Sequence, residues 1–346
     1  MRYKLLHQVD QGDELARHIY ASDGRVLLQE GVPLTVGLIA KLRHMGVWAV
    51  YIKDDTFGEV QVEEMVSETT RRETLGTLSA CHAQIQKGGE VEIQDVQKSV
   101  TKLIEEILEN KDLLLALTDI KTEANEIFVH SLNVCMTSIL IGVKMNLNRE
   151  KLQELAIGAL MHDVGKVTGK VDRTKKDRMQ PEHHTWLGFD ILRVNHEIST
   201  LSAHVALAHH EYLDGSGVPR KLEGNDIHAL ARITTVANDF DNLLTKGDGE
   251  KPMLPHEACE NIMGATNLKY AHPIVWRFLR AVAFYPNGSQ VRLTTGQTGV
   301  VIAQHKGLPQ RPVVRAFNIV GHAKEDYEFV DIDLAEERTV FIKEVL

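Results

Sequence analysis

The stretch AHHEYLDGSGVP, residues 208–219, contains two adjacent histidines followed by Glu211 and Asp214, and it then turns on two glycines and a proline. With 17 histidines in 346 residues, about one adjacent pair is expected by chance, and His183-His184 is already another. Whether the pair at 209–210 has a function therefore depends on the histidines and carboxylates that precede and follow it.

Length and composition describe an ordinary globular chain. A chain of 346 residues is long enough for about two domains, and 43% hydrophobic with 25% charged residues is typical of such proteins. The formal net charge of −9 argues against binding to nucleic-acid polymers or anionic membranes, because both require a basic surface. A local basic pocket for a phosphorylated small molecule remains compatible with this charge.

The cysteines and the apolar segments bear on location. Cys81, Cys135 and Cys259 are far apart and form no CxxC motif, so we expect no disulfide framework and a reducing compartment. The first 18 residues contain no apolar core of a signal peptide. The most apolar stretch, 127–143, is too short and too polar for a membrane span, so we expect a cytoplasmic protein.

Periodicity divides the chain into three parts and predicts a mainly α fold. Residues 1–94 mix strands and a helix at 35–46 with a polar helix at 59–86, residues 95–282 are almost wholly helical, and residues 283–346 are a small β appendage. The first part is expected to be regulatory or to dimerise. Helices are expected after Pro273 and at 95–109, 123–145, 150–163, 184–194, 199–211, 226–246 and 255–265.

Seven of the 17 histidines fall between residues 162 and 210. His162-Asp163 ends the helical pattern KLQELAIGALMHDVGK, His184 and the 209–210 pair follow, and an acidic helix lies near residue 239. Imidazole and carboxylate together suit iron, manganese or zinc. Neighbouring residues on a helix diverge by about 100°, so His209 and His210 would serve two ions about 3.5–4 Å apart rather than one.

Two further residues extend this pattern. Glu126 and His130 are four residues apart on one predicted helix, a spacing at which both can reach one ion. The alternative for this pair is an ordinary solvated or core contact. Lys166 follows the His162-Asp163 pair within one turn, where its ammonium could neutralise a phosphate oxygen.

The order of these motifs resembles the HD-GYP subfamily of the HD metal-dependent phosphohydrolases. Residues 120–265 carry the resemblance, and a weaker match is Lys251-Pro252, near the family's Arg-Pro element. The matching stretches are EIFVHSLNV (126–134), ALMHDVGK (159–166), HTWLGFDIL (184–192), HHEYLDGSGVP (209–219) and ARITTVANDFDNL (231–243).

The resemblance implies an HD-type helical bundle with two or three divalent metal ions, most often iron or manganese. It also implies hydrolysis of a cyclic dinucleotide, chiefly the bacterial second messenger cyclic di-GMP, to linear pGpG, with GMP as the product where hydrolysis continues. Lys166 and Lys251 would contact substrate phosphates, and Asp163 and Lys166 would be the catalytic pair. The implied metal ligands are Glu126, His130, His162, Asp163, His184, His209, His210 and the residue at Asn238.

The sequence departs from the family pattern in three places. Val218 replaces the tyrosine of Gly-Tyr-Pro, and Asn238 stands where a metal-binding aspartate is usual, with Asp239 as a candidate substitute. The basic segment between Lys166 and His184 is short for a lid. These departures keep two other readings open: a catalytically weak protein that binds a cyclic dinucleotide, and a phosphohydrolase of another nucleotide. A homodimer through the apolar stripe at 95–109 also remains open.

Overall fold

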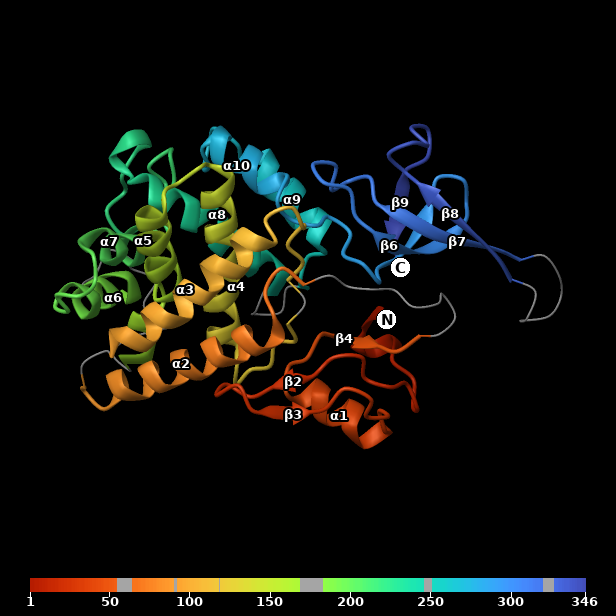
Figure 1. Ribbon diagram of the computed structural model, residues 1–346, viewed down its shortest axis with the longest axis horizontal. Coiled ribbons are helices and arrows are strands. Elements are labelled where there is room, and N and C mark those ends of the chain that lie inside the picture. The colour runs from red at the N-terminus through yellow and green to blue at the C-terminus, as the bar shows by residue number, and fades with distance from the viewer. Residues whose placement is uncertain (55–63, 90–91, 118, 169–182, 246–250, 320–326) are drawn as a thin grey trace.

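The computed structural model describes residues 1–346 except 55–63, 90–91, 118, 169–182, 246–250 and 320–326. It has the predicted mainly α fold in three parts: a small N-terminal α/β module, a helical body and a C-terminal sheet (Figure 1). The N-terminal module and the C-terminal sheet touch, because the Tyr3 amide donates to the Gly288 carbonyl at 3.1 Å.

The N-terminal module has its own hydrophobic core. One helix, α1 (Val36–His44), begins at Thr35, whose hydroxyl accepts from the Leu38 amide. It packs with two antiparallel strand pairs through a cluster that includes Leu15, Leu34 and Leu42. The pairs are β1 (Arg2–Leu5) with β4 (Ala49–Ile52) and β2 (Ile19–Tyr20) with β3 (Val26–Leu28). β1 and β2 had not been expected from the sequence.

The helical body follows the predicted ranges closely. Its helices are α2 (Glu68–Gln86), α3 (Ile93–Glu109), α4 (Glu126–Lys144), α5 (Arg149–Leu160), α6 (His184–Arg193), α7 (Thr200–Ala208), α8 (Ala229–Thr245), α9 (Pro255–Gly264) and α10 (His272–Leu279). The expected helix at 59–86 begins in residues outside the described part. Most of the basic segment that precedes His184 also lies outside the described residues.

Helix α4 is the centre of the body. It packs against α5 and α8, and most of its residues from Val129 to Gly142 are buried. Within the described residues, α4 is the one helix that is long and apolar enough to cross a membrane, but 78% of that stretch is buried inside the protein. Such burial is typical of a core helix, as the polar residues in the sequence had indicated.

Helix α2 packs with the helical body, although the sequence placed residues 59–86 with the N-terminal part. Leu75, Leu78 and Cys81 of α2 belong to the same hydrophobic cluster as the core side chains of α3 and α4. The apolar stripe of α3 faces this cluster through Val100, Leu103 and neighbouring residues, so it is core. The boundaries at residues 94 and 282 stay predictions.

The C-terminal part is a five-stranded antiparallel sheet in the order β8-β7-β6-β5-β9. Its strands are β5 (Gln290–Leu293), β6 (Thr298–Ala303), β7 (Val313–Ile319), β8 (Tyr327–Asp333) and β9 (Ile342–Val345). The first four were expected from short β-prone runs, and β9 was missed. Val291, Val301 and Val314 contribute to a small core of its own.

A close backbone contact positions the His162-Asp163 turn. After α5, the short helix η2 (Val164–Thr168) lies against the start of α6. A Cβ added at Gly165 would be 2.0 Å from the His184 carbonyl oxygen and 2.7 Å from the Gly188 amide. Glycine at position 165 therefore allows the turn to approach α6.

We expect Gly165→Ala to lower the melting temperature and to move His184 from its observed place, because backbone must shift to admit the methyl group. Overpacking of this kind costs about 1–3 kcal/mol. Thermal unfolding followed by circular dichroism tests this. Gly264→Ala is the matched control, since nothing lies within 4 Å of a Cβ there. Equal melting temperatures for the two variants would contradict the prediction.

Candidate metal centre

The 208–219 stretch is a loop built around His209 and His210. Helix α7 ends at Ala208, so the two histidines start the loop. The buried Glu211 carboxylate accepts from the amides of Arg220 at 2.7 Å and Leu222 at 3.0 Å, which closes the loop on itself. Glu211 is therefore structural, although its residue type is also suited to metal binding.

Two further contacts hold this loop. Asp214 accepts from the backbone amide and the hydroxyl of Ser216, and so caps the turn. Gly217 has no room for a side chain, because a Cβ would be 2.4 Å from the Tyr212 amide nitrogen and 2.6 Å from the His210 carbonyl oxygen. The glycine thus keeps the loop packed against the histidine pair.

Three histidines are oriented through their Nδ1 atoms. His162 Nδ1 lies 2.7 Å from the Ala159 carbonyl oxygen, and His209 Nδ1 lies 2.9 Å from the Ala206 carbonyl oxygen. His130 Nδ1 lies 2.6 Å from the Asp241 carboxylate. Because these partners only accept, each Nδ1 carries the hydrogen and each Nε2 presents a lone pair.

The lone pairs meet in the interior of the helical body. His130 Nε2 and His162 Nε2 are 3.1 Å apart, and His209 Nε2 is 3.3 Å from His184 Nε2. The first two atoms have no hydrogen to share when both rings are neutral, so the contact is not a hydrogen bond. A cation between them would turn this repulsion into ligation, which is how metal-binding histidines are usually arranged.

Asp163 lies between the two sets of imidazoles. Its Oδ2 is 3.6 Å from His130 Nε2 and 3.4 Å from His162 Nε2, whereas its Oδ1 is 3.3 Å from His184 Nε2 and 3.6 Å from His209 Nε2. Oδ1 is buried and has no hydrogen-bond partner among the described residues. One carboxylate therefore offers one oxygen to each of two ion positions.

Two groups of candidate ligands result. We call His130, His162 and Asp163 group one, and His184, His209 and His210 group two; within each group the ligand atoms lie within 4.8 Å of one another. Nitrogen and carboxylate donors without thiolate fit iron, manganese or zinc. The donors present therefore fit the metal-dependent chemistry that the resemblance implied.

Burial favours the neutral form of the group-two histidines. Desolvation lowers the pKa of His184 to about 3 and that of His209 well below its ordinary value. Burial alone would raise the pKa of Asp163, but Lys166 and His162 hold it well below its usual range. Neutral imidazoles around an ionised carboxylate are the protonation states that metal binding requires.

Lys166 is the one predicted phosphate contact that lies at the groups. Its ammonium is 2.5 Å from Asp163 Oδ2, and its side chain is 38% exposed. An ammonium there balances the buried carboxylate, and its partial exposure leaves it accessible to a ligand. Lys251 is exposed on the loop before α9, so its contact with substrate stays a prediction.

Helix α8 separates the roles of three neighbouring positions. Asp241 contacts His130, and Asn238, also buried, lies one turn earlier on the same face of the helix. Asp239 points elsewhere, because it accepts from the hydroxyls of Tyr212 at 3.0 Å and Tyr270 at 2.7 Å. Asp239 is therefore occupied away from both groups, and Asn238 keeps the position of the missing carboxylate.

Glu126 does not join group one. It lies in the first turn of α4 with an exposed side chain, whereas His130, one turn later, is buried. Glu126 and His130 therefore differ in burial although they are four residues apart on one helix. His183 caps α6 by accepting from the Thr185 amide.

Two side chains near the groups were not predicted. Asn133 donates to Asp241 at 2.8 Å, and Lys121 lies 2.6 Å from the same carboxylate. Asn133 is three residues after His130 on α4, so helical spacing could have identified it. Lys121 is 120 residues from Asp241, and no local pattern could have paired them.

Comparison with known proteins agrees with this fold. Residues 102–270 match the HD domain family, and residues 290–346 match the family described as a KOW domain associated with HD domain. Over these residues the chain is therefore similar to an HD domain followed by an HD-associated KOW domain.

A solved HDG"Y"P protein, Bd1817 from Bdellovibrio bacteriovorus, aligns with a TM-score of 0.50 at 17% identity, covering 80% of this chain and 97% of that one. At this identity the likeness shows the fold alone.

Two curated relatives are similar in sequence. The cyclic di-GMP phosphodiesterase PA4108 of Pseudomonas aeruginosa is 29% identical over 225 residues, 63% of this chain and 54% of that protein. A cyclic di-GMP phosphodiesterase of Thermotoga maritima is 33% identical over 184 residues, 51% of this chain and 48% of that protein. The chain thus spans about half the length of each relative.

We expect the double variant His162→Ala, Asp163→Ala to lose ions from both groups, because Asp163 offers an oxygen to each. Metal content after equilibrium dialysis against manganese, measured by mass spectrometry, tests this. His204→Ala is the control, since His204 packs on Phe189 and lies in neither group. Two ions retained per chain in the double variant would refute the assignment.

The metal-free protein should lose stability as the pH falls below about 6.5, the pKa of an unfolded histidine. The folded pKa values of His184 and His209 are lower, so the unfolded chain binds more protons in this range. Each buried histidine then weakens folding by up to about 1.4 kcal/mol per pH unit. Urea denaturation at pH 7.5 and 5.5 measures this; coincident midpoints would contradict it.

Proposed function

We propose that this protein is a metal-dependent phosphodiesterase that opens a cyclic dinucleotide. The observation that carries the proposal is the Asp163 carboxylate, with one oxygen near His130 and His162 and the other near His184 and His209. Two adjacent ion positions that share a carboxylate are suited to displacement at phosphorus, in which the attacking and the leaving oxygen both need stabilisation.

The protein's own residues have separate tasks in this proposal. When bound, the ions would activate water and stabilise negative charge on the phosphate. The imidazoles of both groups hold them, and Asp241 and the two helical carbonyls fix the rings. Lys166 would exchange its contact with Asp163 for one with a phosphate oxygen, for which its ammonium is suited.

The substrate we propose is cyclic di-GMP, with linear pGpG and then GMP as products. The support is that both relatives described above are named cyclic di-GMP phosphodiesterases. Iron or manganese is the proposed metal, because the donors are imidazole and carboxylate. We further propose a cytoplasmic location, which agrees with three buried free cysteines.

One observation favours a second function, that of a cyclic-dinucleotide receptor. Asn238 occupies the α8 position one turn before Asp241, where a carboxylate would add charge to group one. A neutral amide is a weaker ligand, so group one would hold its ion less tightly. A protein with one firmly held ion would bind its ligand and turn it over slowly.

The first experiment is turnover of cyclic di-GMP by protein purified without oxygen and reloaded with iron or manganese, with products separated by chromatography. We expect the linear dinucleotide to form, and its formation should stop when a chelator removes the metal. The His162→Ala, Asp163→Ala variant should be inactive, and His204→Ala should match the wild type. A panel with cyclic GMP–AMP and cyclic di-AMP identifies the preferred bases.

The companion variant Asn238→Asp separates the two functions. If the amide limits turnover, the aspartate should raise the rate by about tenfold, as changes around metal ligands commonly do. Tight binding of cyclic di-GMP without product, in the wild type loaded with metal, would make the protein a receptor. Neither binding nor product would reject the proposed substrate.

A further inference from the structure

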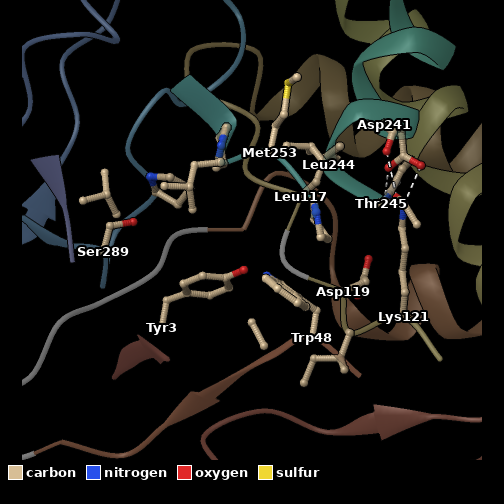
Figure 2. Close-up of a pocket in the computed structure, with 18 of the residues that line it drawn as sticks. Tyr3, Trp48, Leu117, Asp119, Lys121, Asp241, Leu244, Thr245, Met253 and Ser289 are labelled. Atoms are coloured by element: carbon tan, nitrogen blue, oxygen red, sulfur yellow. Dashed lines mark hydrogen bonds and ion pairs between the residues drawn. The ribbon is translucent and has the colours of Figure 1, made fainter. Parts of the chain in front are cut away.

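A cavity lies where the three parts of the protein meet. Its volume is about 160 Å³, and the N-terminal module, the helical body and the C-terminal part all contribute to its lining (Figure 2). Among the described residues that line it, no histidine of either metal group occurs. The cavity is therefore distinct from the candidate metal centre.

One side of the cavity is aromatic. Figure 2 shows the rings of Tyr3 and Trp48 next to each other on the side of the N-terminal module. Tyr285, which stacks on His256, lines it from the C-terminal part. Flat aromatic faces favour a flat ligand, because stacking on aromatic side chains is the common way to bind a planar ring.

The lining also contains two buried acceptor atoms that have no donor among the described residues. Asn133 is 1% exposed, and its amide group donates to Asp241, so its Oδ1 is turned from that carboxylate. Within the described structure this oxygen has no hydrogen-bond partner. Asp119 accepts from Arg71 through Oδ1, but its Oδ2 is likewise buried and unpaired. Unpaired buried acceptors are costly, so a ligand with N–H groups would stabilise them.

Size and acceptors together select the ligand. A cavity of about 150 Å³ accommodates a benzene ring, and the present one is open to solvent beside Trp48, which is 40% exposed. Guanine presents adjacent ring N–H and amino donors, whereas adenine presents an amino group beside an acceptor nitrogen. We propose that this cavity binds the guanine base of a nucleotide, stacked on Tyr3 and Trp48, with its N–H groups toward Asp119 and Asn133.

The cavity is connected to the metal centre through its own lining. Lys121 and Asp241 both line it, and Asp241 contacts Lys121 at 2.6 Å and His130 at 2.6 Å (Figure 2). A base that pairs with Asn133 would bear on the same carboxylate that orients His130. Because coupling between two sites is reciprocal, guanine binding and ion binding at group one should change each other's affinity.

The test is titration of the metal-free full chain with GMP by calorimetry, with AMP as the comparison. We expect GMP to bind with a stoichiometry of one and at least about tenfold more tightly than AMP. Trp48→Leu should weaken GMP binding at least tenfold, and Trp48→Phe, which keeps a stacking ring, should restore most of it. Trp276→Leu is the matched control, because Trp276 is an exposed tryptophan on α10 outside the cavity.

Two further titrations show which nucleotide supplies the base, and they separate this proposal from the proposed function. Cyclic di-GMP is also titrated into the metal-free chain. Binding that depends on Trp48 would show that the cavity takes the cyclic dinucleotide, whereas no such binding would show that it takes the mononucleotide alone. The His162→Ala, Asp163→Ala variant should still bind GMP, so loss of hydrolysis does not imply loss of the cavity. Equal affinities for GMP and AMP, or GMP binding indifferent to Trp48→Leu in folded protein, would overturn the proposal.

Discussion

The carboxylate of Asp163 is the constraint on which the rest of the helical body depends. It is buried with four imidazoles around it, two near each oxygen, and among the described residues the Lys166 ammonium is the cation that balances it directly. An ionised group in the interior is costly unless positive charge compensates it. The histidines that surround Asp163 come from α4, from the turn after α5, from the start of α6 and from the loop after α7, and together they could hold cations in the core.

Rigid supports keep these imidazoles in place. Backbone carbonyls hold His162 and His209, whereas a side chain from another helix, Asp241, holds His130. The last support is shared, because Asp241 also contacts Asn133 and Lys121. Asp241 lines the cavity where the three parts of the protein meet, so a ligand bound there would contact the same carboxylate that orients His130.

Local patterns predicted most of the helices, because α4, α5 and α8 have the 3.6-residue periodicity of helices that bury one face or, for α4, nearly all faces. Short strands were harder: β2 has two residues and β9 four, too few for a period to show. Glu126 is exposed and lies outside both groups, so its role as a ligand stays a prediction. Spacing placed it on the same helix as His130, but spacing does not reveal which side chains are buried.

The sequence alone predicted the ligand types, their order along the chain and the turn at Gly217, since residue identity and local spacing carry that information. The need for glycine at 165 comes from its close contact with α6. Tertiary structure decided which oxygen of Asp163 serves which imidazoles, that Asp239 turns to two tyrosines, and that Lys121 meets Asp241 across 120 residues. The physical reason is distance. Contacts between elements far apart in sequence depend on how whole helices pack, and helix packing depends on the shape of the shared core rather than on any local motif.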